Sequence, residues 1–414
     1  MTKDIYDVAV LGGGASGMMA GIQAAQLGAD TVILEGNECL GKKILATGNG
    51  KCNLTNQRIS EQCYYGADAA FLQRVLQGFT LEDTLDFFED IGVAPVEQEG
   101  YYYPRCRQAG AVVALLRERL LALSVPVMLE TRVRSISKDS DNLFTVTHTG
   151  GRLRCKKVIL ATGGKASAIK GSNGDGYYYA KMFGHNITPL VPALVQLHTN
   201  HPGISAMAGA RCDCRLSLFV QGECVGEESG ELQLTDYGIS GIAVFQLSRM
   251  ASIGLERNMQ VEMSIDFMPE YTKTDVEEIL LRRFEYTPVS PSVKQALWGL
   301  LNDKVIEGVL MACGISTNQS VKDCDREEIV RLRDILKSFI VPITKTHGFK
   351  HAQVTAGGVS TDDICPDTME SLLCPGFYMA GEIVDVDGIC GGYNLQWAWS
   401  SGAVAGRHAA KDII

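Results

Sequence analysis

The chain has 414 residues, 46% hydrophobic and 21% charged, which indicates a globular protein with a substantial core and excludes a disordered one. Its formal net charge of −10 argues against a surface built mainly to bind nucleic acid. The sequence shows no signal-peptide pattern and no apolar run long enough to span a membrane, and its 13 cysteines follow no disulfide or zinc-site spacing. We therefore expect a cytoplasmic protein with no membrane segment, no metal and no nucleic-acid partner.

The first predicted element is a nucleotide-binding unit. The apolar segment Asp7–Leu11 indicates a buried parallel strand, and Gly12, Gly14 and Gly17 follow it with the spacing G-x-G-x-x-G as the chain turns into a helix. That spacing permits a tight turn, lets a pyrophosphate approach the backbone and lets the helix pack on the strand. A second strand ends at Glu35, 18 residues past Gly17, where a carboxylate binds ribose hydroxyls. We expect the dinucleotide to contact Gly12, Gly14, Ala15, Ser16, Gly17, Glu35 and Gly36.

The later elements favour FAD over NAD as this dinucleotide. Strand patterns recur at residues 132–136 and 156–164, and Asp175 is the expected N-cap of the next helix. Near the end of the chain, a strand to Met379 and the glycine pair 391–392 precede a last helix. A nucleotide fold completed from the C-terminus in this way is typical of proteins that wrap an extended FAD, with the last helix directed at the flavin. We expect a non-covalent FAD.

An insert separates the two halves of this predicted α/β fold. Short strand-like segments bounded by turns begin at about residue 191, and apolar residues at helical spacing follow from about residue 273. The predicted segments are 1–190 for the first part of the FAD-binding domain, 191–272 for a β-rich insert, 273–342 for a helical insert and 343–414 for the second part of the FAD-binding domain.

Several sequence blocks carry a family resemblance. In chain order they read GGGASG, GKKILATGNGKCNLTN, VILATGG, GSNGDGY, TDYGISG, QVTAGGV and GEIVDVDGICGGYNLQWAWSSG. In these blocks the chain resembles the BaiN-like flavoproteins, which include aminoacetone-oxidase-like and YhiN-type members. The resemblance implies a Rossmann-like two-dinucleotide-type FAD-binding fold, split by an insert with a small β-barrel-like part and a helical part. The chain departs from the family pattern at Asp236 and Ile242, where the family often has histidine and proline.

These blocks supply the remaining candidate site residues. The further cofactor-binding candidates are Lys42, Lys43, Thr47, Gly48, Asn53, Val133, Ala161, Thr162, Gly163, Gly381, Glu382, Gly392, Tyr393, Asn394 and Leu395. The alternative for the lysines is a solvated loop, and the alternative for Thr47, Asn53 and Asn394 is a local backbone cap. The candidate catalytic residues are Tyr393, Asp236 and Tyr237, with packing or an ordinary turn as their alternative roles.

The expected chemistry is hydride transfer through the flavin N5 atom. A second strand–glycine–helix unit is missing from the sequence, so NADH or NADPH would act as a transient reductant. The resemblance implies either reduction of an activated C=C bond in a 3-oxo bile-acid-like or other enone substrate, which we favour, or oxidation of a small amino-ketone by oxygen. Two other classes stay open: a non-enzymatic FAD-binding or RNA-associated protein, and an NAD-dependent dehydrogenase.

Overall fold

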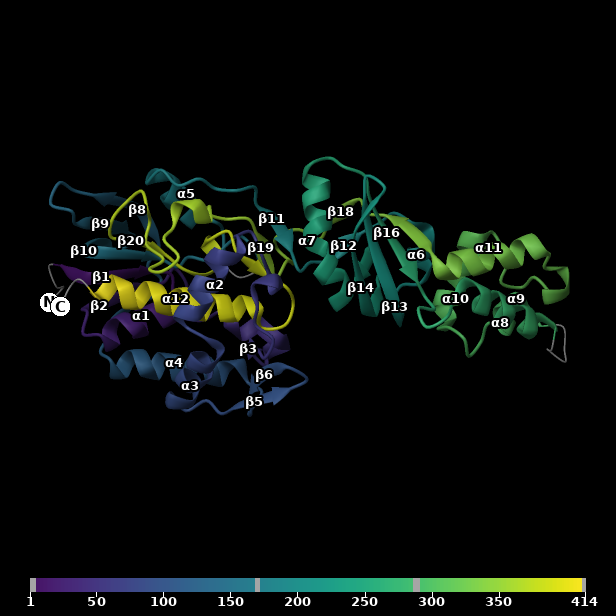
Figure 1. Cartoon of the computed structure of the whole chain (residues 1–414), viewed down its shortest axis with the longest axis horizontal. Helices are drawn as coiled ribbons and strands as arrows, with labels where there is room; N and C mark the ends of the chain where they lie inside the picture. The colour runs from purple at the N-terminus through teal and green to yellow at the C-terminus, as the bar shows by residue number, and fades with distance from the viewer. Residues whose placement is uncertain (1–4, 168–171, 286–290, 412–414) are drawn as a thin grey trace. The chain divides into compact units, whose positions relative to one another are not determined.

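The computed structural model describes residues 5–167, 172–285 and 291–411, which form two compact units (Figure 1). Unit 1 contains the described residues up to Leu190 and from Val354 onward, and unit 2 contains Val191–Gln353. Each unit has its own hydrophobic core. The finer division into four segments stays a prediction.

Unit 1 is built on a mixed sheet with a parallel centre, which confirms the predicted α/β class. Its strands are β7 (Val127–Met128), β2 (Thr31–Leu34), β1 (Tyr6–Leu11), β10 (Gly151–Leu160), β9 (Phe144–His148), β8 (Val133–Lys138) and β20 (Phe377–Met379). β1 pairs in parallel with β2 and β10, and the last three residues of β10 pair in parallel with β20. β9 and β8 continue the sheet in antiparallel order. The central strands are buried, as expected for parallel strands that are covered on both faces.

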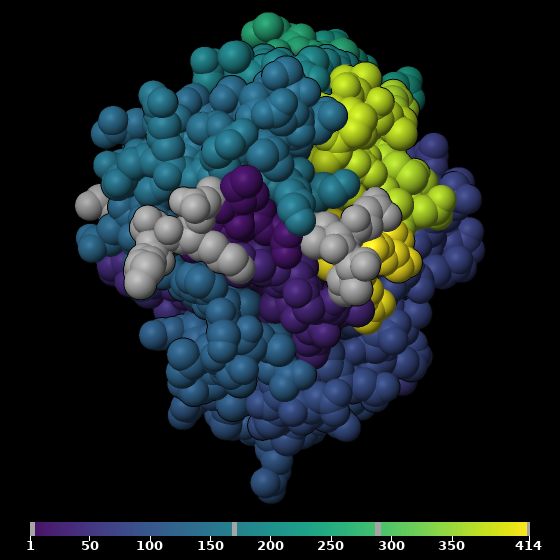
Figure 2. All heavy atoms as spheres, turned by 90° about the vertical axis from the view of Figure 1, so that its left-hand side faces the viewer, coloured from purple at the N-terminus to yellow at the C-terminus, as the bar shows by residue number. Residues whose placement is uncertain are grey.

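Helices from both ends of the chain pack together in unit 1. The helices are α1 (Ala15–Gln26), α2 (Ala69–Gly78), α3 (Leu81–Asp90), α4 (Ala109–Ala122), α5 (Asp175–Met182) and α12 (Tyr393–Lys411). α1 and α12 lie side by side (Figure 1), and a Cβ atom on Gly402 or Gly406 would lie 2.5 Å from the Ser16 carbonyl oxygen or 2.3 Å from that of Ala20. On the face of unit 1 drawn in Figure 2, purple N-terminal and yellow C-terminal segments come to the surface together. The small residues of α12 therefore allow two backbones to approach closely.

Helix α5 begins one residue earlier than the sequence suggested. Asp175 was predicted to be its N-cap, but Asp175 is the first helical residue and Gly174 is the N-cap. Gly174 has a φ of 79°, a left-handed conformation that suits glycine, and Asn173 Oδ1 accepts the Asp175 N–H at 3.1 Å. The prediction was wrong because Gly174 takes the N-cap position in a left-handed conformation, and Asn173 satisfies the Asp175 N–H.

Short elements complete unit 1 around the ends of the central strands. The strands are β3 (Thr55–Asn56), β4 (Tyr64–Tyr65), β5 (Pro95–Gln98), β6 (Tyr101–Pro104), β19 (Val354–Ala356) and β21 (Asp387–Gly388), and the 3₁₀ turns are η1 (Ile44–Gly50), η2 (Glu61–Cys63), η4 (Thr361–Asp363) and η5 (Gly381–Ile383). β21 pairs with β4, so the C-terminal segment is hydrogen-bonded to the segment that follows the first nucleotide-binding strands.

Unit 2 combines an antiparallel sheet with a group of helices. In spatial order the sheet strands are β17 (Phe339–Pro342), β16 (Val261–Asp266), β13 (Arg211–Val220), β14 (Glu223–Leu234), β15 (Gly238–Ser240), β12 (Leu197–His198) and β18 (Lys345–Thr346), and the short strand β11 spans Val191–Ala193. The helical elements are α6 (Pro202–Ala206), α7 (Ile242–Glu256), α8 (Lys273–Glu285), α9 (Val293–Ala296), α10 (Asp303–Cys313), η3 (Val321–Asp323) and α11 (Arg326–Lys337). In the described parts of the chain, no helix is both long and apolar enough to cross a membrane.

Candidate functional site

The glycine turn after β1 is closed by backbone contacts at two of its glycines and open at the third. Gly12 has a φ of +107°, and a Cβ atom on it would lie 2.4 Å from the Ala161 carbonyl oxygen. A Cβ atom on Gly17 would lie 1.9 Å from the Gly12 carbonyl oxygen, whereas one on Gly14 would meet no atom within 4 Å. The protein's own packing therefore requires Gly12 and Gly17, while Gly14 faces open space.

The residues around this open space fit a dinucleotide. α1 has Gly14 as its N-cap, with no capping side chain and no acidic residue in the first turn, so its first N–H groups and dipole stay available to phosphate. Cβ atoms on Gly36 and Gly163 would also meet nothing within 4 Å. Thr162 Oγ1 and Asn53 Oδ1 are buried without a hydrogen-bond partner in the protein, which is rare unless a ligand or water supplies one.

Glu35 is held against the glycine turn. Its side chain is buried, with 9% exposure, and its Oε2 accepts the Gly13 N–H at 2.7 Å. Oε1 accepts from the backbone N–H and the side-chain amide of Asn37, at 2.8 and 2.7 Å. The carboxylate thus fixes the turn, a role that the sequence did not suggest. Its contact with ribose hydroxyls stays a prediction.

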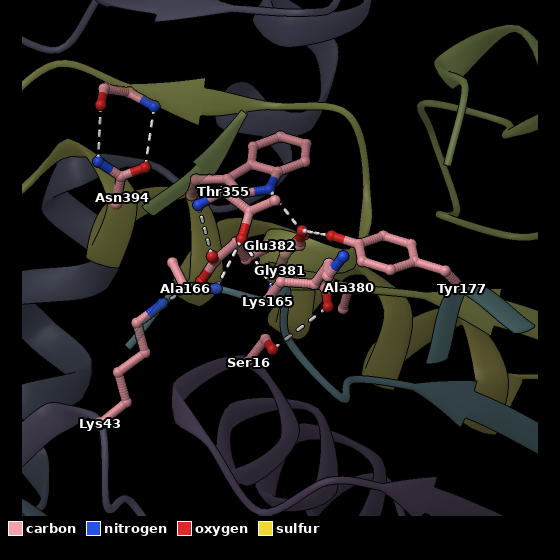
Figure 3. Close-up of polar contacts among 12 residues, drawn as sticks. Ser16, Lys43, Lys165, Ala166, Tyr177, Thr355, Ala380, Gly381, Glu382 and Asn394 are labelled. Atoms are coloured by element: carbon pink, nitrogen blue, oxygen red, sulfur yellow. Dashed lines mark hydrogen bonds and ion pairs between the residues drawn. The ribbon is translucent and has the colours of Figure 1, made fainter. Parts of the chain in front are cut away.

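Glu382 connects three segments of unit 1 (Figure 3). Its Oε2 accepts a hydrogen bond from Lys43 Nζ in an ion pair, and its Oε1 accepts the Thr355 N–H at 2.8 Å. The Thr355 hydroxyl oxygen in turn accepts the backbone N–H groups of Lys165 and Ala166, at 2.8 and 2.9 Å. The Glu382 carboxylate therefore joins the loop after β2 to β19, and Thr355 of β19 in turn holds the loop after β10.

Thr355 could not be recognised as a site residue from the sequence. The only sequence signal was the block QVTAGGV, which resembled the family but carried no assigned role. The Thr355 hydroxyl oxygen accepts the backbone N–H groups of Lys165 and Ala166, which lie outside any helix or strand. It therefore fixes the path of the chain that follows Gly163 and Gly164.

The turn before α12 is fixed by hydrogen bonds to its backbone carbonyls. Ser16 Oγ donates to the Ala380 carbonyl at 3.3 Å, and Trp397 Nε1 donates to the Gly381 carbonyl at 3.1 Å. The Tyr177 hydroxyl donates to the Glu382 carbonyl at 3.4 Å, and burial, followed by the charges of Glu382 and a second acid, raises the pKa of Tyr177. The structure thus brings Ser16, Gly381 and Glu382 together, and their contact with a cofactor stays a prediction.

Tyr393 and Asn394 stand at the start of α12. Asn394 Oδ1 accepts the Gly388 N–H at 2.8 Å, and its Nδ2 donates to the Gly388 carbonyl at 2.7 Å, so this side chain holds the preceding loop. Tyr393 is 6% exposed, and its ring lies edge-on to that of Tyr64 with 6.0 Å between centroids. Burial, followed by the charge of Cys63, raises the pKa of Tyr393 to about 12, so it keeps its proton near neutral pH.

The other cofactor candidates have local contacts. Lys42 pairs with Glu38 at 2.9 Å, and Thr47 Oγ1 donates to the Ile44 carbonyl at 2.6 Å, as expected for the loop and cap alternatives. Three candidates lie elsewhere in unit 1: Gly48 in η1, Val133 at the start of β8 and Leu395 in the first turn of α12. A Cβ atom on Gly392 would lie 2.7 Å from the Thr55 carbonyl, so packing requires this glycine.

Asp236 and Tyr237 lie in unit 2, in the turn between β14 and β15. Thr235 N donates to the Gly238 carbonyl across this turn at 2.9 Å. Asp236 is exposed, and the ring of Tyr237 lies 4.6 Å from that of His347 and 4.8 Å from that of His198. The catalytic role of both residues stays a prediction. As far as the structure describes the chain, no group of three or more His, Cys, Asp or Glu side chains is arranged to hold a metal ion.

Comparisons with known proteins cover nearly the whole chain. A family described as the HI0933-like protein Rossmann domain matches residues 6–408. A 3-dehydro-bile acid delta(4,6)-reductase of Clostridium scindens is 41% identical over 98% of this chain and 99% of its own length. A ribosomal RNA dihydrouridine synthase of Escherichia coli is 30% identical over 99% of this chain and 98% of its own. The solved 3-ketosteroid-delta4-(5alpha)-dehydrogenase of Rhodococcus jostii, 16% identical, shares the fold with a TM-score of 0.52 over 99% of this chain and 98% of that one. These matches confirm the family resemblance inferred from the sequence.

Proposed function

This chain belongs to the HI0933-like Rossmann-domain family and is an FAD-dependent oxidoreductase, and we propose that it reduces a C=C bond conjugated to a carbonyl in a 3-oxo steroid or bile-acid-like substrate. The observation that carries the proposal is the full-length similarity to the bile-acid reductase. The backbone at Gly14, Gly36 and Gly163, which we call the cradle, supports it, because a Cβ atom at each of these positions would meet no protein atom within 4 Å and a dinucleotide can approach.

In this proposal the two ends of unit 1 share the cofactor. The first turn of α1 takes the pyrophosphate, Glu35 takes the ribose hydroxyls, and Thr162 and Asn53 supply polar contacts. When bound, FAD supplies a site at N5 that accepts and donates hydride. The pair formed by Lys43 and Glu382 fixes the turn before α12, whose N-terminus favours negative charge.

The reduction also needs a proton. A conjugated C=C bond takes hydride at the carbon β to the carbonyl, and an acid then protonates the α-carbon or the enolate oxygen. Tyr393, Tyr237 and Asp236 are the proposed donors. Tyr393 is favoured in this role because it stands at the start of α12, the helix end that the proposal directs at the flavin. We further propose that NADH or NADPH is the transient reductant and that the protein works in the cytoplasm, where its 13 free cysteines stay reduced.

A second candidate substrate is uridine in ribosomal RNA. Relatives from Escherichia coli and Haemophilus influenzae, 30% and 29% identical, are named for the product dihydrouridine. The C5=C6 bond of uracil is conjugated to the C4 carbonyl, so its reduction adds hydride and a proton in the same way. The small molecule is favoured here because the net charge is −10, whereas RNA binding relies on Lys and Arg contacts with phosphates.

The test uses the reduced holoenzyme without oxygen. Separate samples are mixed with 3-oxo-4-cholenoic acid, with a uridine-containing RNA fragment and with oxygenated buffer, and flavin absorbance and product mass are followed. We expect the enone to reoxidise the enzyme fastest and to gain two hydrogens. Reduction of the RNA alone would assign the second substrate. Oxidised holoenzyme is mixed separately with an amino-ketone. Flavin reduction in that sample, fast peroxide formation with oxygen and no enone product would overturn the reductase in favour of the oxidase.

A further inference from the structure

Two tyrosine rings of unit 1 meet at Gly391, just before α12. Gly391 has a φ of +126°, and a Cβ atom on it would lie 2.9 Å from Tyr101 Cε1 and 3.2 Å from Tyr393 Cε2. In each ring this carbon is bonded to the carbon that bears the hydroxyl, so the polar ends of both phenols lie close to Gly391. Tyr393 is 6% exposed, and Tyr101 is half-buried. We call Tyr101 and Tyr393 the tyrosine pair.

Regular secondary structure holds Tyr101 in this position. It lies in β6, the middle strand of a three-stranded sheet, and its partner in β3 is Asn56. Asn56 is buried, and its Nδ2 donates to the Gly391 carbonyl at 2.9 Å. In Figure 1, β3 and β6 lie beside the N-terminal end of α12. The Asn56 amide therefore joins this sheet to the loop before α12 and keeps the tyrosine pair together.

A buried acceptor marks the same end of α12 as a binding site. A Cβ atom on Gly392 would lie 3.0 Å from Asn53 Oδ1. Within the described chain this oxygen is buried and accepts no hydrogen bond, which is rare unless a ligand or a water supplies the donor. In the proposed function that donor belongs to the flavin ring. The substrate must lie against the flavin to receive hydride, so groups that border the flavin ring also border the reacting bond.

The hydroxyl of Tyr393 has a weak partner in the structure. Cys63 Sγ donates to the Arg58 carbonyl at 3.5 Å, so the sulfur is the acceptor in its hydrogen bond with Tyr393. Sulfur accepts hydrogen bonds weakly. A carbonyl oxygen beside the tyrosine pair would therefore take this hydroxyl from Cys63.

We propose that Tyr101 is a further catalytic residue and that the tyrosine pair binds the carbonyl oxygen of the enone, each phenol donating one hydrogen bond. A carbonyl oxygen has two lone pairs and so accepts two donors. This inference rests on the proposed function and deepens it, because it names the residues that recognise the carbonyl group.

The tyrosine pair suits the charge that develops during the reduction. As hydride arrives at the β-carbon, the electron pair of the C=C bond shifts toward the carbonyl and forms an enolate, whose negative charge lies largely on oxygen. Hydrogen bonds to that oxygen strengthen as the charge develops, so both donors lower the barrier. Tyr393 then gives its proton to the enolate and recovers one from water, while Tyr101 keeps its proton throughout.

The first measurement follows a bound ligand rather than turnover. Oxidised holoenzyme is mixed with 3-oxo-4-cholenoic acid that carries a carbon-13 label at the carbonyl, and infrared difference spectroscopy records the carbonyl stretch. Because hydrogen bonds lower the frequency of this stretch, we expect it to rise in Tyr101→Phe and in Tyr393→Phe, and most in the double variant. Loss of one hydrogen bond in Tyr101→Phe should also weaken ligand binding about threefold to tenfold.

The second measurement follows reoxidation of the reduced holoenzyme in a stopped-flow instrument. Tyr101→Phe should slow reoxidation by the enone about 100-fold, as for the loss of one donor to an oxyanion, and should change reoxidation by oxygen by less than about twofold. Its FAD content should equal that of the wild type, because phenylalanine keeps the ring that packs on Gly391. The matched control is Tyr102→Phe, the same change at the next residue of β6, whose side chain points to the other face of the strand. It should alter neither the stretch nor the rates.

The outcomes separate this inference from the proposed function. An unchanged carbonyl stretch in Tyr101→Phe overturns the inference, and an altered flavin spectrum in that case would place the hydroxyl on the cofactor. A changed stretch with a wild-type rate of reoxidation by the enone overturns the catalytic role of Tyr101. If the wild-type protein binds the enone with a stretch that depends on Tyr101 but does not reduce it, the proposed function fails and the carbonyl site stands. Absence of binding by the wild-type protein overturns both.

Discussion

Lys43 and Glu382 are 339 positions apart in the chain and form an ion pair in unit 1. Lys43 belongs to the loop after β2, and Glu382 to the turn before α12. The other carboxylate oxygen of Glu382 accepts the Thr355 N–H. Glu382 therefore links Lys43, in the N-terminal part of unit 1, with Thr355, in its C-terminal part. Among the described residues, the neighbouring Lys42 pairs with Glu38, four residues earlier in the same loop.

Because Lys43 pairs with Glu382 and Lys42 pairs with Glu38, substitution of these two adjacent lysines should affect FAD binding unequally. Lys43→Met should weaken FAD binding by about tenfold, because Glu382 then lacks the counter-ion that helps to fix the turn before α12. Lys42→Met removes the same charge from a surface pair and should change FAD binding by less than about twofold. Titration of each apoprotein with FAD, followed by flavin fluorescence, measures both effects. Equal losses in the two variants would mean that Lys43 acts only through general charge.

The glycine turn gives a prediction that separates cofactor binding from folding. Gly14→Val should leave a folded but colourless protein, because the new side chain enters open space that FAD needs. Gly17→Ala should destabilise the apoprotein by about 3 kcal/mol, because its Cβ would lie 1.9 Å from a carbonyl oxygen. The FAD-to-protein ratio and urea unfolding of both apoproteins test this. A yellow Gly14→Val protein would place the pyrophosphate elsewhere.

Glu35 should show two separable effects. Glu35→Ala removes the acceptor of the Gly13 and Asn37 donors, so we expect the apoprotein to lose about 1–3 kcal/mol of unfolding free energy. It should also retain FAD less well, because the proposed ribose contact is lost. Glu35→Gln keeps one acceptor oxygen and should be less destabilised. If apoprotein stability falls while FAD affinity is unchanged, the carboxylate fixes the turn and does not bind ribose.

His185 predicts a loss of stability in mild acid. Its side chain is 3% exposed and bonds to Ser371 at 2.8 Å, and burial lowers its pKa despite the opposing charge of Asp363. The unfolded chain therefore takes up this proton first, and stability falls as the pH drops below about 6.5, by up to about 1.4 kcal/mol per pH unit for this group. Urea unfolding at pH 7.5, 6.5 and 5.5 measures the slope. His185→Gln should start less stable and show a shallower decline, and an unchanged slope would contradict the assignment.

The elements that could be predicted from the sequence are those whose residues contact near neighbours in the chain. Gly12 and Gly17 lie against each other within one turn, so the spacing of the glycines was enough to predict the strand, the turn and α1. The network of Glu382 could not be found in this way. Lys43 and Lys165 lie outside the long helices and strands and Thr355 lies in the short strand β19, and they meet only through long-range packing. The same holds for the bond between His198 and His347, which are 149 positions apart.

The close approach of α1 and α12 has a consequence for how the protein is made. The first helix ends at Gln26, and the glycines that pack against it, Gly402 and Gly406, are synthesised 376 and 380 positions later. At about 5–20 residues per second, roughly 20 to 80 s pass between the synthesis of α1 and that of α12. Unit 2 is one continuous segment and can fold during that interval. We therefore expect a ribosome-bound chain that lacks α12 to carry a folded insert and to bind no flavin, so that the cofactor is loaded only once α12 has been made.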